Sequence, residues 1–337
     1  TGFGQAVKDI SMKGIFMEKS LKKDIIINRL PVVIYFILIF AALMVIISAV
    51  APMSNHEPKT TDTYSDFSTG WLNCEESEAS LDHLSGTTVI HRTITAADCN
   101  KTLFFFAKTS NIKVFIDGVC QYRNNHFCSQ FFGKTPGALF VNVLIPAESD
   151  GKLLEIEIEN PYKDDDSAKL DEMYIGDISD IIQFQQQKRF NSFCISFIIM
   201  VLGVVMLLLF IPLTRQKIVG IEFLNLGVTA FVSGLYLTTD GRYLQLVFGD
   251  AHIYHVIAET ALRLSILPFL IFLSQMYESY SKRISAILCV IGEIAFAGCF
   301  IGEITEIMDY HETLFLVHVV FAISMLFILV STIKGIV

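Results

Sequence analysis

Residues 191–213 read NSFCISFIIMVLGVVMLLLFIPL, a stretch of 23 residues without a charged side chain. As a helix it would be about 34 Å long, enough to cross the roughly 30 Å hydrocarbon core of a bilayer. Five further apolar runs are similar, so the chain is predicted to be a membrane protein with an α-helical bundle of six spans. The predicted spans are residues 31–50, 191–213, 219–238, 253–275, 284–302 and 312–333.

The composition agrees with this fold class. Hydrophobic residues make up 53% of the 337 residues, and the mean hydropathy is +0.54. Both values are high for a soluble chain, so the lipid bilayer is the first expected partner. The formal net charge of −9 argues against a nucleic-acid partner, because binding to phosphate needs positive charge.

The first apolar run follows a basic segment, residues 1–30, and has two interpretations. Ala49-Val50-Ala51 has the small-x-small form of a signal-peptide cleavage site. However, the run exceeds the usual 7–15 residue core of a signal peptide, and Pro52 would follow the cut. We favour an uncleaved transmembrane anchor. Met17 looks like a more natural start than Thr1, so either residues 1–16 are extraneous or the sequence is a fragment.

The distribution of basic residues predicts the orientation of the spans, because positive charge near span ends is retained in the cytoplasm. Basic residues precede the first predicted span and follow the second, fourth and sixth, as with Lys22, Lys23, Arg215, Lys217, Lys282, Arg283 and Lys334. The other connections are mainly acidic. The expected localisation is the plasma membrane, with both termini cytoplasmic and residues 52–190 extracytoplasmic.

Residues 52–177 are expected to form an extracytoplasmic all-β sandwich, because short alternating segments are separated there by Gly, Pro, Asn and Asp. Asp117-Gly118 predicts a tight hairpin with positive φ at both turn residues. Residues 178–190 are expected to form a juxtamembrane helix that leads into a five-span region, residues 191–337. The predicted strands are residues 87–93, 103–108, 112–116, 119–123, 139–145, 153–159 and 172–175.

Four cysteines fall in the predicted outer domain: Cys74, Cys99, Cys120 and Cys128. An even count outside the cytoplasm permits two disulfides with three possible pairings. Cys120 and Cys128 could close one small loop, and Cys74 with Cys99 is the remaining pair. No Cys-x-x-Cys or clustered His pattern predicts a metal site, and no cofactor is expected.

Several motifs, in their order along the chain, resemble the outer domain of a family of bacterial membrane sensors. They are YSDFSTGW at residues 64–71, LFFF at 103–106, VFIDG at 114–118, GKTPG at 133–137 and YIG at 174–176. In that family a galactose-binding-like jelly roll lies outside the cell. It is followed by a membrane region resembling the seven-transmembrane receptors with diverse intracellular signalling modules.

In the family the last span usually leads to a GGDEF diguanylate cyclase, and less often to a histidine kinase. This sequence departs from the pattern: five spans follow the outer domain, and it contains no GGDEF motif or kinase His box. The resemblance therefore implies a signal-transduction sensor whose output domain is absent from this chain. No enzymatic activity is expected within residues 1–337.

The resemblance also implies that the jelly roll detects a small extracellular ligand, for which carbohydrate is the leading class. Aromatic faces stack on sugars, and a few polar side chains orient them. The candidate residues are Trp71, Tyr122, Arg123, Asn124, Asn125, His126 and Lys134. A lone Trp in a small β domain also commonly fills the core, and we favour the core for Trp71.

Polar side chains inside the predicted spans form a second set of candidates, because a charge at the bilayer centre costs at least about 2.5–3.5 kcal/mol. They are Asn225, His255, Glu259, Arg263, Glu293 and His318. His255, Glu259 and Arg263 form one stripe, Glu293 and His318 could face the same bundle interior, and Asn225 could join them. Glu259 and Arg263 are four residues apart on one helix face and can pair. The set either fixes helix packing, binds a ligand or proton, or contacts further spans or a second protomer of a homodimer.

Three functions are compatible with these features. A sensor explains the outer domain, the short loops and the cytoplasmic end. A multi-span transporter or membrane transferase would use the Glu and His side chains chemically, but such proteins commonly carry internal repeats or broken spans, and none is evident. A surface adhesin or assembly factor would not need six spans.

Overall fold

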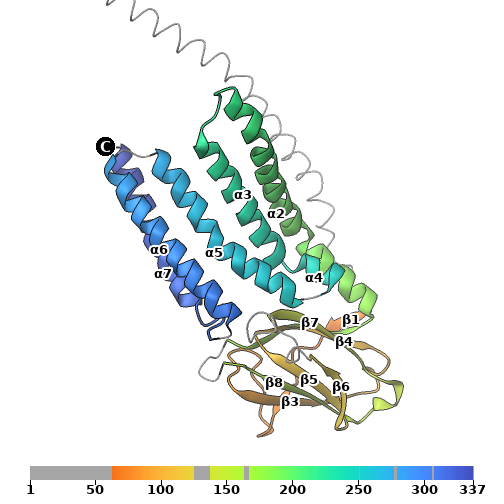
Figure 1. Ribbon diagram of the computed structural model, residues 1–337. Coiled ribbons are helices and arrows are strands. Elements are labelled where there is room, and N and C mark those ends of the chain that lie inside the picture. Colours follow the sequence, from red (N-terminus) through yellow and green to blue (C-terminus); the bar gives the residue numbers. More distant parts are fainter. Residues whose placement is uncertain are drawn as a thin grey trace, which may run out of the picture.

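The computed structural model describes residues 63–124, 137–162, 167–249, 251–276, 279–305 and 307–336, with side chains except at 273–282 and 331–336. In this part of the chain, a β domain lies at one end of a helical bundle (Figure 1). The β domain precedes the bundle in sequence, as the switch from alternating to continuous apolar patterns predicts.

The β domain contains two antiparallel sheets. The four-stranded sheet has the order β1 (Tyr64–Asp66), β9 (Lys169–Gly176), β4 (Thr102–Lys108), β7 (Ala138–Leu144). The five-stranded sheet has the order β2 (Leu72–Asn73), β3 (Thr87–Thr93), β8 (Leu153–Glu159), β5 (Asn111–Ile116), β6 (Val119–Arg123). All seven predicted strands are present, and the two short strands β1 and β2 were not predicted.

The two sheets share one hydrophobic core, to which both contribute fully buried side chains. Leu154, Ile156 and Ile158 of β8 have 0% exposure, while the alternating Glu residues lie on the other face of the strand. The predicted hairpin between β5 and β6 is confirmed, with φ of 51° at Asp117 and 73° at Gly118. Both angles fall in the region that this type of turn requires.

The described cysteines of the β domain, Cys74, Cys99 and Cys120, carry free thiols in the structure. The Cys74 thiol points to the carbonyl of Val89, and the Cys99 thiol points to that of Thr95, so the expected Cys74–Cys99 bridge is not formed. The two cysteines follow different strands, and their thiols point to different backbone carbonyls, on β3 for Cys74 and four residues back in the chain for Cys99. The Cys120 thiol is free and points to the carbonyl of Tyr122, and Cys128 lies outside the described residues, so the predicted Cys120–Cys128 pair is not supported either.

Six helices follow within the described residues: α2 (Ile178–Arg215), α3 (Ile221–Asp240), α4 (Tyr243–Phe248), α5 (Ala251–Met276), α6 (Ser279–Ile304) and α7 (Leu314–Ile336). Helix α2 packs on α3, α3 on α5, and α5 on α6, while α7 contacts both α5 and α6. The short helix α4 lies between the β domain and the bundle (Figure 1).

Four of these helices are long and apolar enough to cross a membrane: α2, α3, residues 251–272 of α5 and residues 283–304 of α6. A shorter apolar segment occupies residues 314–330 of α7. The predicted spans from residue 191 onward therefore fall on helices, whereas residues 31–50 lie outside the described part. The expected juxtamembrane helix is the first part of α2, which runs without a break from the β domain along the bundle.

Two glycines allow α2 and α3 to approach closely. A Cβ atom at Gly234 would lie 2.4 Å from the backbone nitrogen of Met200, and one at Gly203 would lie 2.3 Å from that of Phe231. Small residues at such crossings let helix backbones pack tightly where lipid gives no hydrophobic drive for association. Close backbone packing at these two glycines therefore determines how α2 and α3 pack together.

Candidate functional site: the junction between the β domain and the bundle

Strand β4 identifies the surface where the β domain meets the helices. An alternating strand buries one face, yet Leu103 through Ala107 are all buried. Phe104 and Phe106 point away from the core and pack with Phe140 of β7. The guanidinium of Arg242, just before α4, lies 3.8 Å from the centre of the Phe106 ring. The outer face of the four-stranded sheet is thus covered by the end of the bundle.

The first contact to the bundle is an ion pair at the start of α2. Glu172 of β9 accepts hydrogen bonds from Lys188 at 2.9 Å and from Arg189 at 2.5 Å. Burial alone would raise the pKa of Glu172, but the two cationic partners outweigh it and lower that pKa. The Phe184 ring stacks on Tyr64 at 5.5 Å, so apolar contact accompanies the ion pair.

The second contact lies at the free edge of β7, the last strand of its sheet. The side-chain amide of Gln245 on α4 faces this edge, with its two polar atoms each 3.0 Å from a backbone group, the carbonyl of Ala138 and the amide of Phe140. The amide is assigned the orientation that satisfies both groups, in which its nitrogen donates to Ala138 and its oxygen accepts from Phe140. One side chain thereby satisfies backbone groups that an edge strand would leave open. Next to it, Gly137 has φ of 77° and approaches His255 so closely that a Cβ atom would lie 2.8 Å from that side chain.

The third contact connects the β domain to the loop between α6 and α7. Tyr162 follows β8, and its hydroxyl donates a hydrogen bond to the carboxylate of Asp309. Its ring stacks on His311 with centroids 4.4 Å apart, and Ser167 lies 3.3 Å from Nε2 of the same histidine. Tyr162 and Asp309 are 7% and 1% exposed, so their hydrogen bond is shielded from water.

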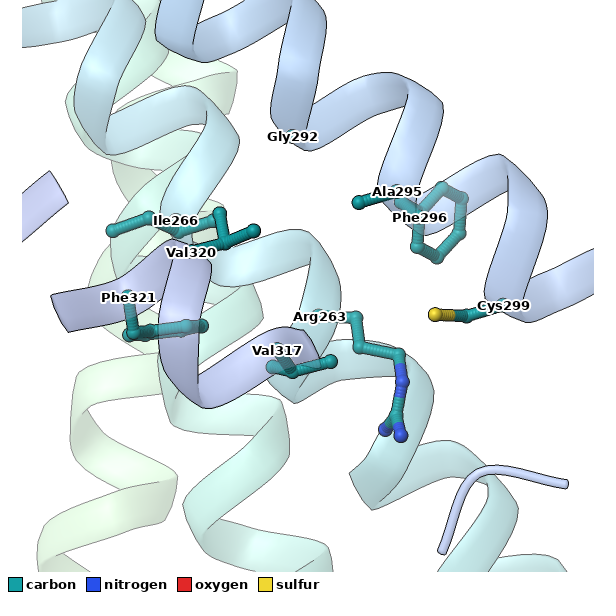
Figure 2. Close-up of a pocket in the computed structure, with 9 residues that line it drawn as sticks. All are labelled: Arg263, Ile266, Gly292, Ala295, Phe296, Cys299, Val317, Val320 and Phe321. Atoms are coloured by element: carbon teal, nitrogen blue, oxygen red, sulfur yellow. The ribbon is translucent and has the colours of Figure 1, made fainter. Parts of the chain in front are cut away.

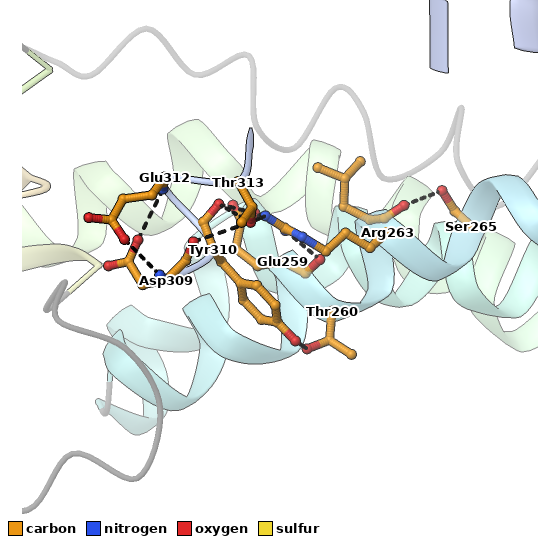
Figure 3. Close-up of polar contacts among 9 residues, drawn as sticks. Glu259, Thr260, Arg263, Ser265, Asp309, Tyr310, Glu312 and Thr313 are labelled. Atoms are coloured by element: carbon orange, nitrogen blue, oxygen red, sulfur yellow. Dashed lines mark hydrogen bonds and ion pairs between the residues drawn. The ribbon is translucent and has the colours of Figure 1, made fainter. Parts of the chain in front are cut away.

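The loop then turns into α7 through a reciprocal pair of hydrogen bonds. The amide of Asp309 donates to the Glu312 carboxylate at 2.9 Å, and the amide of Glu312 donates to the Asp309 carboxylate at 3.0 Å (Figure 3). This is a capping box, which satisfies backbone donors at the start of a helix. Asp309 therefore serves two structural roles: it caps the turn and receives the Tyr162 hydroxyl.

Arg263 connects this loop to the middle of α5. Its guanidinium donates to Glu259 at 2.6 Å, to the carbonyl of Tyr310 at 2.6 Å and to Thr313 at 3.3 Å (Figure 3). It also lies 4.1 Å from the centre of the Tyr310 ring, whose hydroxyl is 3.1 Å from Thr260. A buried polar chain therefore runs from Tyr162 of the β domain to Glu259 of α5.

A cavity of about 280 Å³ lies beside this chain, between the β domain and the bundle. The β domain contributes Lys108, Thr109, Gly137 and Ala138 to its wall, and the helices contribute groups from the α3–α4 corner and from α5. Its charged and polar lining includes Lys108, Asp240, Arg242, Gln245, His255 and Glu259.

A second space lies on the other side of Arg263, between α5, α6 and α7 (Figure 2). Its wall is apolar apart from Arg263 and Cys299, and its volume is about 20 Å³. That volume has room for about one water molecule, so the slot is too small for a ligand. Among the described residues, no group of three or more His, Cys, Asp or Glu side chains is placed to hold a metal ion.

The predicted sugar-binding residues are only partly described. Trp71 is 1% exposed in the core, where its indole nitrogen donates to Phe67, so its ring is not available to a sugar. Tyr122 is half-buried and Arg123 is exposed, both on β6, and Asn124 is buried against Ile112. Asn125, His126 and Lys134 lie outside the described residues, and sugar binding by this loop stays a prediction.

The structure brings together half of the intramembrane candidates. The predicted Glu259–Arg263 pair is confirmed, and His255 lies on the same face of α5 beside the cavity. Asn225 is 15 residues before the end of α3 at Asp240, about 22 Å along the helix, and does not join them.

Glu293 and His318, which could have faced the bundle interior, are both exposed in the described part of the chain. Each is one residue from a buried position, Gly292 on α6 and Val317 on α7, and one residue along a helix rotates a side chain by about 100°. Depth in an apolar run therefore did not determine which way these side chains point.

Sequence reasoning missed the residues that link the two parts, namely Tyr162, Asp309, Tyr310, His311 and Thr313. One signal was readable: Asp309-x-x-Glu312 before an apolar run is the pattern of a capping box. The chain matches no protein-family model, no curated protein and no solved structure, so its function is argued from the residues of the junction.

Proposed function

We propose that this chain is a transmembrane sensor, in which an outer jelly-roll domain detects a ligand and a bundle of six spans transmits the signal. The output is a cytoplasmic enzyme, for which a diguanylate cyclase of the GGDEF class is our first choice. The choice of output and the jelly-roll assignment rest on the resemblance described above. Carbohydrate is the ligand class that the same resemblance implies.

The arrangement of charge supports the orientation. Arg215, Lys217 and Arg283 lie at the helix ends far from the β domain, whereas Asp309 and Glu312 lie next to it. Basic residues are retained in the cytoplasm, so this distribution favours an extracytoplasmic β domain and cytoplasmic termini. Residues 31–50 provide the first of the six spans in this proposal.

The observation that carries the proposal is the set of three contacts by which the β domain grips the bundle. They reach α2 through Glu172, α4 through Gln245, and the α6–α7 loop through Tyr162. A β domain that served only as a surface adhesin would need no more than one flexible connection to the bundle. Contact alone is no proof of coupling, so coupling has to be measured.

The test fuses residues 1–337 in frame to a diguanylate cyclase domain and measures cyclic di-GMP in cells. We expect Asp309→Asn and Tyr162→Phe to change the output several-fold, although the cyclase lies across the membrane from both residues. The reason is that each variant weakens the same buried hydrogen bond.

Gln121→Ala is the matched control, because Gln121 is exposed on β6 and belongs to none of the three contacts. It should leave the output unchanged. Equal cyclic di-GMP in wild type and both junction variants, at equal protein levels and melting temperature, would rule out transmission through this contact.

A further inference from the structure

We infer that the cavity between the β domain and the bundle is a binding site for a small zwitterion of the α-amino-acid class. None of the described sugar-binding candidates, Trp71 and residues 122–124, lines it, and its existence does not depend on the signalling proposal. The inference rests on the composition of the wall, on the absence of ion-pair partners for three of its four charges among the described residues, and on its size.

The wall brings together charges of both signs from distant parts of the chain. Lys108 comes from the end of β4, Asp240 and Arg242 from the corner between α3 and α4, and Glu259 from α5. A purely anionic ligand would be repelled by the two carboxylates, and a purely cationic ligand by Lys108 and Arg242. A molecule with one carboxylate and one ammonium group fits both pairs.

Three of these four charges have no ion-pair partner among the described residues, whereas Glu259 is paired with Arg263. The side chains of Lys108, Asp240 and Arg242 make no hydrogen bond and no ion pair within 4 Å with any residue that the structure describes. Arg242 lies over the Phe106 ring, and Asp240 and Arg242 attract each other at longer range. Nε2 of His255 is buried and, within the same described residues, also lacks a hydrogen-bond partner. Buried polar groups are normally satisfied, so an unsatisfied nitrogen beside a cavity points to a bound polar group.

The size selects a compact ligand. A volume of about 280 Å³ is at the lower end of the roughly 300–1,000 Å³ typical of small-molecule pockets. In the proposed pose Lys108 and Arg242 bind the carboxylate. Asp240 binds the ammonium group, together with the Glu259 oxygen that is not bonded to Arg263. Charge-assisted hydrogen bonds of this kind are about twice as strong as neutral ones.

The experiment measures the melting temperature of the full chain in lipid nanodiscs with each of the twenty L-amino acids at about 10 mM, which is about 100 times the Kd of a 0.1 mM binder. At least one amino acid should raise the melting temperature in a concentration-dependent way. Its amide, which lacks the carboxylate, and its N-acetyl derivative, which lacks the ammonium group, should not. A set of neutral monosaccharides is tested in parallel.

Two variants test the pose from opposite ends. Asp240→Asn and Lys108→Met should each weaken the apparent Kd at least about tenfold, because each removes one charged partner. Both positions are exposed, so both variants should fold, and Gln121→Ala should bind like wild type.

The inference is overturned if no amino acid shifts the wild type, if only a monosaccharide does, or if the shift persists in both variants. Because binding is read from melting temperature, this result is independent of cyclase output. A failure here would remove the site and leave the signalling proposal standing.

Discussion

Replacing Arg263 by Met should destabilise the bundle by about 3 kcal/mol, at the lower end of the 3–5 kcal/mol cost of breaking a buried ion pair. The Arg263 side chain is 1% exposed and donates four hydrogen bonds, two to Glu259, one to Tyr310 and one to Thr313. Met fills similar volume without charge, so the loss comes from the polar contacts and from leaving Glu259 unpaired. Polar side-chain contacts in membrane bundles contribute only about 0.6 kcal/mol on average. The Arg263–Glu259 contact should contribute more, because both groups are charged and Arg263 makes further hydrogen bonds.

The assay is equilibrium unfolding of the purified chain in mixed micelles titrated with sodium dodecyl sulfate, followed by helical circular dichroism. Adding Glu259→Gln to Arg263→Met removes the stranded carboxylate, so the double variant should recover at least about 1.5 kcal/mol relative to additivity. Arg215→Met, at an exposed site, is the matched control and should change stability by less than about 0.5 kcal/mol. A loss below about 1 kcal/mol for Arg263→Met, the range of exposed ion pairs, would refute the reasoning.

Three further predictions concern the packing and the junction. Gly234→Ala should lower the free energy of unfolding by about 1–3 kcal/mol, because the added methyl group would overpack against Met200. Gly298→Ala on α6 should be neutral or stabilising, because a Cβ atom there meets nothing within 4 Å. Both variants are measured by the same unfolding assay. The pKa of Glu172 is lower in the folded than in the unfolded protein, so its contribution to stability is present above about pH 4.3 and is lost as the pH falls through the folded pKa. Glu172→Gln should therefore flatten the acidic part of a profile of melting temperature against pH. An unchanged slope in that acidic range would contradict this prediction. Gln245→Ala should speed amide hydrogen exchange at Phe140, and equal exchange rates would exclude a role for that amide at the strand edge.

Much of the fold was predictable because it follows from patterns that repeat over many residues. Continuous apolar runs indicated the helices from residue 191 onward, and alternation indicated strands such as β8, whose buried Ile156 stands between two Glu residues. Strands β1 and β2 were missed because three and two residues are too short to show a period.

The junction was harder to predict because it depends on contacts between residues far apart in sequence. The Glu259–Arg263 pair was readable, since both lie on one helix face. The hydrogen bond from Tyr162 to Asp309 joins two residues that are 147 positions apart in the sequence, and no local pattern predicts it. The exposure of Glu293 and His318 could not be predicted for the same reason. Which face of a helix is buried depends on the helices that pack against it, and local sequence does not identify them.

The central claim is that a change at the junction alters the positions of the helix ends at the opposite side of the bundle. It is tested most directly by the distance between spin labels at Lys217→Cys and Arg283→Cys, two exposed positions at the far end of the bundle, on a background without the native cysteines. Measured in nanodiscs by pulsed electron paramagnetic resonance, the distance distribution should shift when Tyr162→Phe or Asp309→Asn weakens the junction. Superimposable distributions in folded wild-type and variant proteins would contradict the claim.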